Sequence, residues 1–139
     1  MTALAAGRNS PEAVGQLYVL PVAAATLIYA GALVALNATG WLTKGAASTT
    51  LKQFGRAEKT VDNTLGANGA LSCEVKTGIF RWANSSAGDL IALTEVGSDC
   101  YIVDDQTVAK TNGTATRSRA GKVVFVDASG VYVQMGPQF

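Results

Sequence analysis

The sequence contains no histidine, so it lacks the side chain whose unperturbed pKa lies closest to neutrality. The commonest general acid–base group and the commonest zinc ligand are therefore missing. No glycine-rich phosphate loop, nucleophile elbow or pair of carboxylates at a catalytic spacing is present either. The absence of histidine does not exclude catalysis by carboxylates or by a Ser–Lys pair. We nevertheless expect a structural or binding protein, not an enzyme, with no cofactor and no bound metal.

Charge is also scarce, at 15% of the 139 residues, against roughly 25% in an average soluble domain. Eleven basic residues nearly balance ten acidic ones. Nucleic acid is bound largely through neutralisation of its phosphates, so this balance gives no reason to expect nucleic-acid binding. Because charged residues are few, much of the protein surface must be uncharged, and such a surface favours contact with other protein subunits.

The few residues that could bind metal or react have simpler structural interpretations. Cys73 and Cys100 lie far apart, lack metal-ligand spacing and fall in predicted strands, which favours two buried thiols. A disulfide between them stays open. Asp104 and Asp105 could bind calcium, but a turn pair that hydrogen-bonds its own backbone is favoured.

The longest uncharged segment runs from Ala13 to Leu42. Its central part, Leu17–Leu36, is long and apolar enough to cross a bilayer as a helix. Pro21 and Gly31 interrupt it, however, and short buried strands are the alternative, at residues 16–20, 25–29 and 33–37. We favour the strands and expect no membrane association. The residues before this segment are small and polar, which is typical of a flexible arm.

From Trp41 onward, short runs of strand-forming residues alternate with turn residues. Buried positions alternate before Gly78 and change parity after it, which predicts a β-bulge there. Asn112-Gly113 predicts a turn, and residues 122–126 and 131–134 predict a hairpin around Asp127–Gly130. Further strands are expected at residues 90–93, 99–104 and 107–110.

These runs, eight to ten in number, predict an all-β fold: a compact β-barrel or β-sandwich of short antiparallel strands with an extended N-terminal arm. We expect residues 1–24 to form the arm and first strand, and residues 25–139 to form a single β-domain. Aromatic, apolar and basic side chains outside the expected core supply the candidates for a protein interface. They are Tyr18, Leu20, Val22, Trp41, Arg117 and Arg119.

Four segments taken in order carry a family resemblance: AGALVALNATGWL, VDNTLGANGALSCEVKTGIFRWAN, CYIVDDQTVAKT and AGKVVFVDASGVYV. They resemble the head-decoration proteins of tailed bacteriophages, which are also called capsid cement proteins. The resemblance extends from about Ala30 to the end of the sequence. Its most detailed parts are Val61–Thr64, Tyr101–Val108 and the hairpin around Asp127–Gly130, none of which is catalytic.

The resemblance implies a structural virion protein on the outer capsid surface, made in the host bacterial cytoplasm. Its partner would be the major capsid protein, whose subunits it bridges. The family also implies a homo-oligomer, a trimer more than a dimer, and an N-terminal arm that reaches onto the shell or a neighbouring copy. Two alternatives stay open. One is a membrane-anchored or exported β-domain with Leu17–Leu36 as anchor, and the other is a different virion component such as a tail protein.

Overall fold

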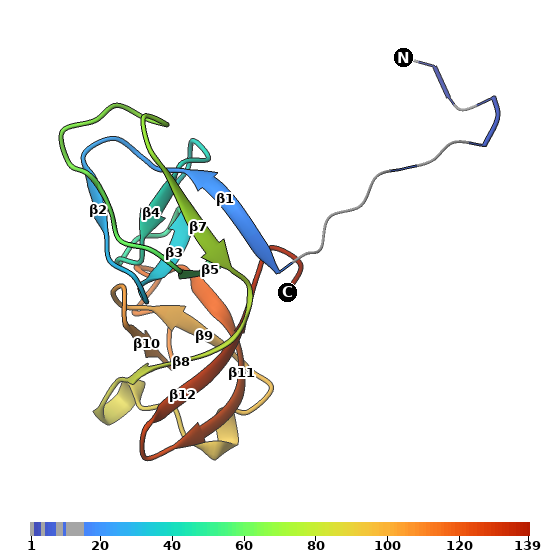
Figure 1. Ribbon diagram of the computed structural model, residues 1–139. Coiled ribbons are helices and arrows are strands. Elements are labelled where there is room, and N and C mark those ends of the chain that lie inside the picture. Colours follow the sequence, from blue (N-terminus) through green and yellow to red (C-terminus); the bar gives the residue numbers. More distant parts are fainter. Residues whose placement is uncertain (1, 4, 8–9, 11–15) are drawn as a thin grey trace.

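The computed structural model describes residues 2–3, 5–7, 10 and 16–139, so most of the expected arm lies outside the described residues. The described chain is all-β, as the sequence predicts, with twelve strands and two short 3₁₀ helices (Figure 1). In chain order these are β1 (Leu17–Pro21), β2 (Thr26–Ile28), β3 (Leu33–Leu36), β4 (Leu42–Lys44), β5 (Lys52–Ala57), β6 (Val61–Asn63), β7 (Ser72–Lys76), β8 (Gly78–Asn84), η1 (Ala87–Asp89), η2 (Leu93–Glu95), β9 (Asp99–Ile102), β10 (Thr107–Ala109), β11 (Arg119–Asp127) and β12 (Gly130–Met135).

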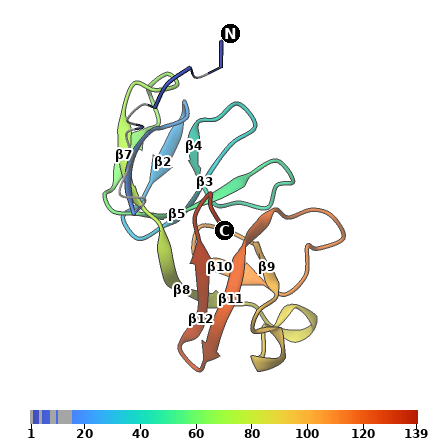
Figure 2. The same cartoon turned by 90° about the vertical axis from the view of Figure 1, so that its right-hand side faces the viewer.

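The strands form two main bodies that lie one above the other in both ribbon views (Figures 1 and 2). The upper body contains a five-stranded sheet in the order β1-β7-β5-β3-β4, together with the two-stranded pair β2-β6. The lower body is a closed barrel in the order β10-β8-β12-β11-β9. The paired strands are antiparallel except β8 and β10, which run parallel.

Each body has its own hydrophobic core, and β3 contributes to both. Leu33 and Ala35 face the barrel core around Trp82 and Ile102, whereas Val34 faces the upper core. Successive side chains of a strand point to opposite faces, so a strand covered on both sides needs apolar residues at every position. This double burial explains why the sequence around β3 is continuously apolar.

The chain passes from the upper sheet to the barrel between β7 and β8. Cys73 and Val75 are buried in the upper core, and Phe80 and Trp82 are buried in the barrel core. Gly78 lies between them with φ +148°, a conformation that L side chains rarely adopt. The predicted change of parity is therefore confirmed, but its cause is a change of sheet at a corner and not a bulge within one strand pair.

The uncharged N-terminal segment forms strands and not one long helix. β1, β2 and β3 lie within one residue of the expected bounds. In the part of the chain that the structure describes, no helix is long and apolar enough to span a membrane. The helical anchor considered for Leu17–Leu36 is therefore replaced by three strands.

The strand expected at residues 90–93 is wrong, because residues 90–92 form an irregular link between η1 and η2, and residue 93 begins η2. The Asn84 side chain donates a hydrogen bond to the Ile91 carbonyl (2.8 Å) and accepts one from the Ile91 amide (2.9 Å). A side chain thus satisfies the backbone groups that a neighbouring strand would otherwise bind.

The hairpin of β11 and β12 is confirmed, with Asp127 Oδ1 accepting from the amides of Ser129 and Gly130.

Candidate protein-binding surface

The interface candidates of the N-terminal third lie together in the upper body. Tyr18 packs edge-to-face on Phe54, with 5.1 Å between ring centroids, and Leu20 packs against the upper core. The Trp41 ring lies against Gly69, where a Cβ atom would come within 3.0 Å of Cζ3. These three residues are only partly buried. Val22 is fully buried and leaves no surface for a partner, so it is a core residue and not an interface residue.

Arg117 and Arg119 belong to the barrel and already have partners within the chain. The Arg117 guanidinium lies 3.2 Å from Asp89 Oδ2 and also donates to the Thr111 carbonyl. The Arg119 guanidinium lies 2.8 Å from Asp99 Oδ1 and donates to the Phe139 carbonyl. These two interface candidates are therefore held in two separate ion pairs within the chain.

Asp89 anchors the turn between β10 and β11. Its carboxylate accepts from the Thr111 hydroxyl and from Arg117. These two partners, the Thr111 hydroxyl foremost, hold the pKa of Asp89 below its usual value. Within the turn, Gly113, Thr114 and Ala115 all have φ near +60°. The Arg117 guanidinium therefore stabilises a tight turn through bonds within the chain.

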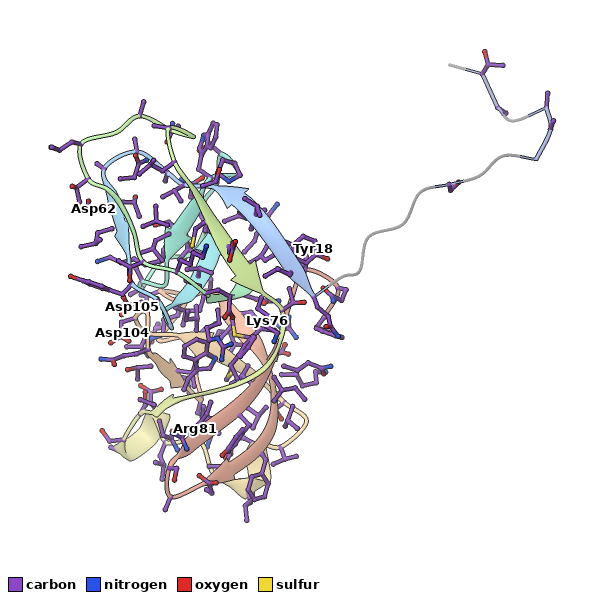
Figure 3. All side chains as sticks on the ribbon, viewed as in Figure 1. Tyr18, Asp62, Lys76, Arg81, Asp104 and Asp105 are labelled. Carbon is purple, nitrogen blue, oxygen red and sulfur yellow. The ribbon has the colours of Figure 1, made fainter. Side chains whose placement is uncertain are left out.

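The acidic pair and the cysteines also have local structural roles. Asp104 and Asp105 lie side by side in the turn between β9 and β10 (Figure 3), where Asp104 Oδ1 accepts from the Gln106 amide at 2.9 Å. Among the described residues, no group of three His, Cys, Asp or Glu side chains could hold a metal ion.

Cys73 and Cys100 are both free and buried, in different cores, as expected.

Two prominent hollows open on the surface of the described part of the chain. The larger, about 370 Å³, is lined by Leu36, Leu51, Lys52, Gln53, Phe54, Arg119 and Pro137. The second, about 330 Å³, lies between Tyr29–Ala32 and Asp105–Gln106. The ionisable residues in the lining are Lys52 and Arg119 in the first hollow and Tyr29 and Asp105 in the second, and Arg119 is already paired with Asp99.

Among the described residues, the most exposed large apolar side chain is that of Leu65, at 102% of its reference area. It lies in the loop between β6 and β7, here called the Leu65 loop (residues 64–71). Buried Asn63 holds this loop, donating to the carbonyls of Ala23 (2.9 Å) and Ala67 (3.0 Å). Before the loop, Asp62 accepts from the Thr64 amide and hydroxyl. Leu65 is therefore presented on a framework that is already hydrogen-bonded.

The Leu65 loop is also hydrogen-bonded to the segment that follows β1. Asn68 Oδ1 accepts from the Ala24 amide at 2.7 Å, and the Gly69 amide donates to the Val22 carbonyl at 2.9 Å. An apolar side chain held on an ordered loop costs little entropy when it binds a partner. Sequence reasoning missed Leu65, although a single leucine within a run rich in Asn and Gly is a recognisable signal.

A second group of exposed apolar residues lies on β1, where Leu17 and Val19 are 57% and 66% exposed. They face away from Tyr18 and Leu20, which point toward the upper core. The sequence could not distinguish the two faces, because both carry apolar side chains.

The chain matches no family model, and searches of curated proteins and of solved structures find no similar protein.

Proposed function

We propose that this chain is a structural virion protein that decorates the outer surface of a tailed-phage capsid and bridges major capsid subunits. It is made in the host bacterial cytoplasm and has no catalytic role in this proposal. The support is the ordered series of segments that resembles the decoration proteins, together with the all-β fold and the exposed apolar side chains. The same resemblance implies a trimer, with a dimer as the alternative.

The observation that carries the proposal is the construction of the Leu65 loop. The motif Val61–Thr64, which is part of the resemblance, contains both Asp62 and Asn63, whose side chains fix the loop. Neither Asp62 nor Asn63 lines either of the two hollows described above. They are used to hold Leu65 outward, which is an arrangement suited to inserting an apolar side chain into a neighbouring protein.

Bridging stabilises a shell by mass action, because a protein that binds only the assembled lattice shifts the equilibrium toward it. Each contact can be modest, since a copy that touches several subunits holds them with a high effective concentration. The low charge of the chain suits such contacts, because less desolvation of charged groups opposes binding.

Cryo-electron microscopy of particles of the phage that encodes the chain tests this function. We expect density for the barrel and the five-stranded sheet on the outer capsid surface. Density in the tail would instead support the alternative of a tail component, and absence from the particle would exclude both. The membrane alternative depended on a helix over Leu17–Leu36, where three strands are found.

The contribution of the loop is tested by co-sedimentation with capsids that lack the chain. We expect Leu65→Asp to weaken capsid binding at least tenfold, because a charge would have to be desolvated in the apolar contact. Leu93→Asp is the matched control, since Leu93 is also exposed (65%) but lies in η2, beside the barrel. Equal binding by both variants would remove the loop from the contact.

A further inference from the structure

The outer strand of the five-stranded sheet has an unused edge. Among the described residues, β1 pairs only with β7, and it lies at the outer margin of the upper body (Figure 1). Two backbone hydrogen bonds fix the phase of this pair: Thr77 donates to the Gln16 carbonyl, and Val22 donates to the Leu71 carbonyl, both at 2.9 Å. In an antiparallel pair, alternate residues face the partner strand. The backbone groups of Leu17, Val19 and Pro21 therefore face away from β7.

Leu17 and Val19 expose both the backbone groups and the side chains that a second strand would contact. Within the described chain, the N–H and C=O groups of Leu17 and Val19 take part in no hydrogen bond. Their side chains are also mostly exposed. Natural proteins usually protect such an edge with charged residues, bulges or proline. β1 carries no charge, and its one proline is at its last position.

We propose that β1 pairs with β1 of a second copy of this chain. The two strands run antiparallel about a two-fold axis, with Leu17 opposite Val19 of the other copy. These two symmetry-related pairs use every free N–H and C=O of Leu17 and Val19. On the outer face, Leu17 and Val19 of each copy cover those of the other, which removes apolar surface from water.

The charges on β7 favour this register. Lys76 is opposite Leu17, and Glu74 is opposite Val19. Each row across the joined sheets therefore begins with Lys76 of one copy and ends with Glu74 of the other, about 14 Å away at three strand spacings. The attraction is weak at this range, and Glu74 is also paired with Lys59 of its own copy (3.4 Å), but its sign is favourable.

The competing register places Val19 opposite Val19. It puts the two copies of Glu74 at the ends of one row, where like charges repel. It also sets Leu17 opposite Pro21, which has no N–H to donate. The edge is thus complementary to itself in one register, and this favours a second copy over an unrelated strand as its occupant.

The pairing is tested on the full-length chain alone by light scattering over a range of concentrations. We expect a mass of twice 14.3 kDa. Val19→Lys should weaken dimerisation at least tenfold, because it brings a charge into the joined face. Ile79→Lys is the control, since Ile79 is similarly exposed (53%) but belongs to the barrel. A monomeric or trimeric wild-type chain, or equal weakening by both variants, would overturn the proposal.

The register is tested by oxidation of single-cysteine additions. A mixture of Leu17→Cys and Val19→Cys should form a mixed disulfide, because paired Cα atoms in a hydrogen-bonded pair lie about 5.5 Å apart. Val19→Cys alone should cross-link poorly, since its symmetry mate lies on a diagonal of about 7–8 Å. Efficient cross-linking of Val19→Cys alone would overturn this register. Native Cys73 and Cys100 are buried and should not interfere.

These experiments use no capsids. Failure of dimerisation would leave the proposed capsid binding unaffected, and failure of capsid binding would leave the dimer unaffected. A dimer in solution would select the dimeric alternative over the trimer that the resemblance implies.

Discussion

At the scale of single residues, Cys100 is the clearest case of an ionisable group held neutral by the fold. It is fully buried in the barrel core. Burial raises the pKa of its thiol from an ordinary 9.0 to about 12, because the charged thiolate would lose its hydration. Nearby Asp99 acts in the same direction, whereas Arg119 opposes it. The thiol is therefore expected to be unreactive in the folded chain.

This shift predicts a loss of stability at alkaline pH. Between pH 9 and 12 the unfolded chain loses the Cys100 proton while the folded chain keeps it. The free energy of unfolding should therefore fall as pH rises, by up to about 1.4 kcal/mol per pH unit. Below pH 9 the contribution is fully present. Urea unfolding at several pH values between 8 and 11 measures this slope.

The slope is assigned by comparing two variants. Cys100→Ala should reduce it, whereas Cys73→Ala should retain the Cys100 contribution. Burial raises the pKa of Cys73 as well, but that residue belongs to the other core. Identical slopes in wild type and Cys100→Ala would contradict the prediction.

Residue roles were predicted best where they depend on sequence neighbours. The turn formed by Asp104 and the cap formed by Asp127 are local, and each bonds an amide two or three residues away. Arg117 and Arg119 are different, because their partners lie 28 and 20 residues earlier in the chain. A single sequence shows the two nearby arginines but not the carboxylates that folding brings beside them.

At the scale of elements, β5 and β7 approach each other too closely for any side chain at Gly55. A Cβ atom there would lie 2.1 Å from the Lys76 carbonyl oxygen. Gly55→Ala should therefore force the strands apart and lower the free energy of unfolding by about 1–3 kcal/mol. Gly88→Ala is the control, because Gly88 in η1 has no atom within 4 Å of that position. Thermal unfolding followed by circular dichroism should show a lower midpoint for Gly55→Ala alone. Equal thermal midpoints for Gly55→Ala and Gly88→Ala would show that the strands accommodate the methyl group without loss of stability.

Strands were recognisable from sequence, but their partners were not. The bounds of β1, β2 and β3 follow from Gly and Pro breaks, and the β11–β12 hairpin follows from its turn. Pairing such as β10 with β8 or β5 with β7 joins segments separated by many residues, and local pattern carries no information about it. The same limit explains the candidate surface. Both faces of β1 are apolar, so only the position of the upper core decides that Leu17 and Val19 are exposed.

At the scale of the whole molecule, the two cores are held together by non-covalent contacts as well as by the polypeptide chain. β3 contributes side chains to both of them. The Gln53 side chain donates to the Gly136 carbonyl (2.6 Å) and accepts from the Gly136 amide (2.8 Å), which ties β5 to the end of β12. Ser118 donates to the Ser48 carbonyl (2.6 Å) and accepts from the Leu51 amide (3.1 Å). Opening either body would therefore leave buried groups of the other without partners.

This coupling predicts that the two bodies unfold together, as the expected single β-domain over residues 25–139 requires. The two tryptophans report on them separately, because Trp82 is buried in the barrel core and Trp41 packs on Gly69 in the upper body. In Trp41→Phe the remaining fluorescence follows the barrel, and in Trp82→Phe it follows the upper body. Within each variant, the urea midpoint from fluorescence should equal the midpoint from far-ultraviolet circular dichroism. Each comparison is made inside one variant, so the destabilisation caused by Trp82→Phe does not affect it. A fluorescence midpoint displaced from the dichroism midpoint in either variant would mean that one body melts first and that the bonds at Gln53 and Ser118 do not couple the cores.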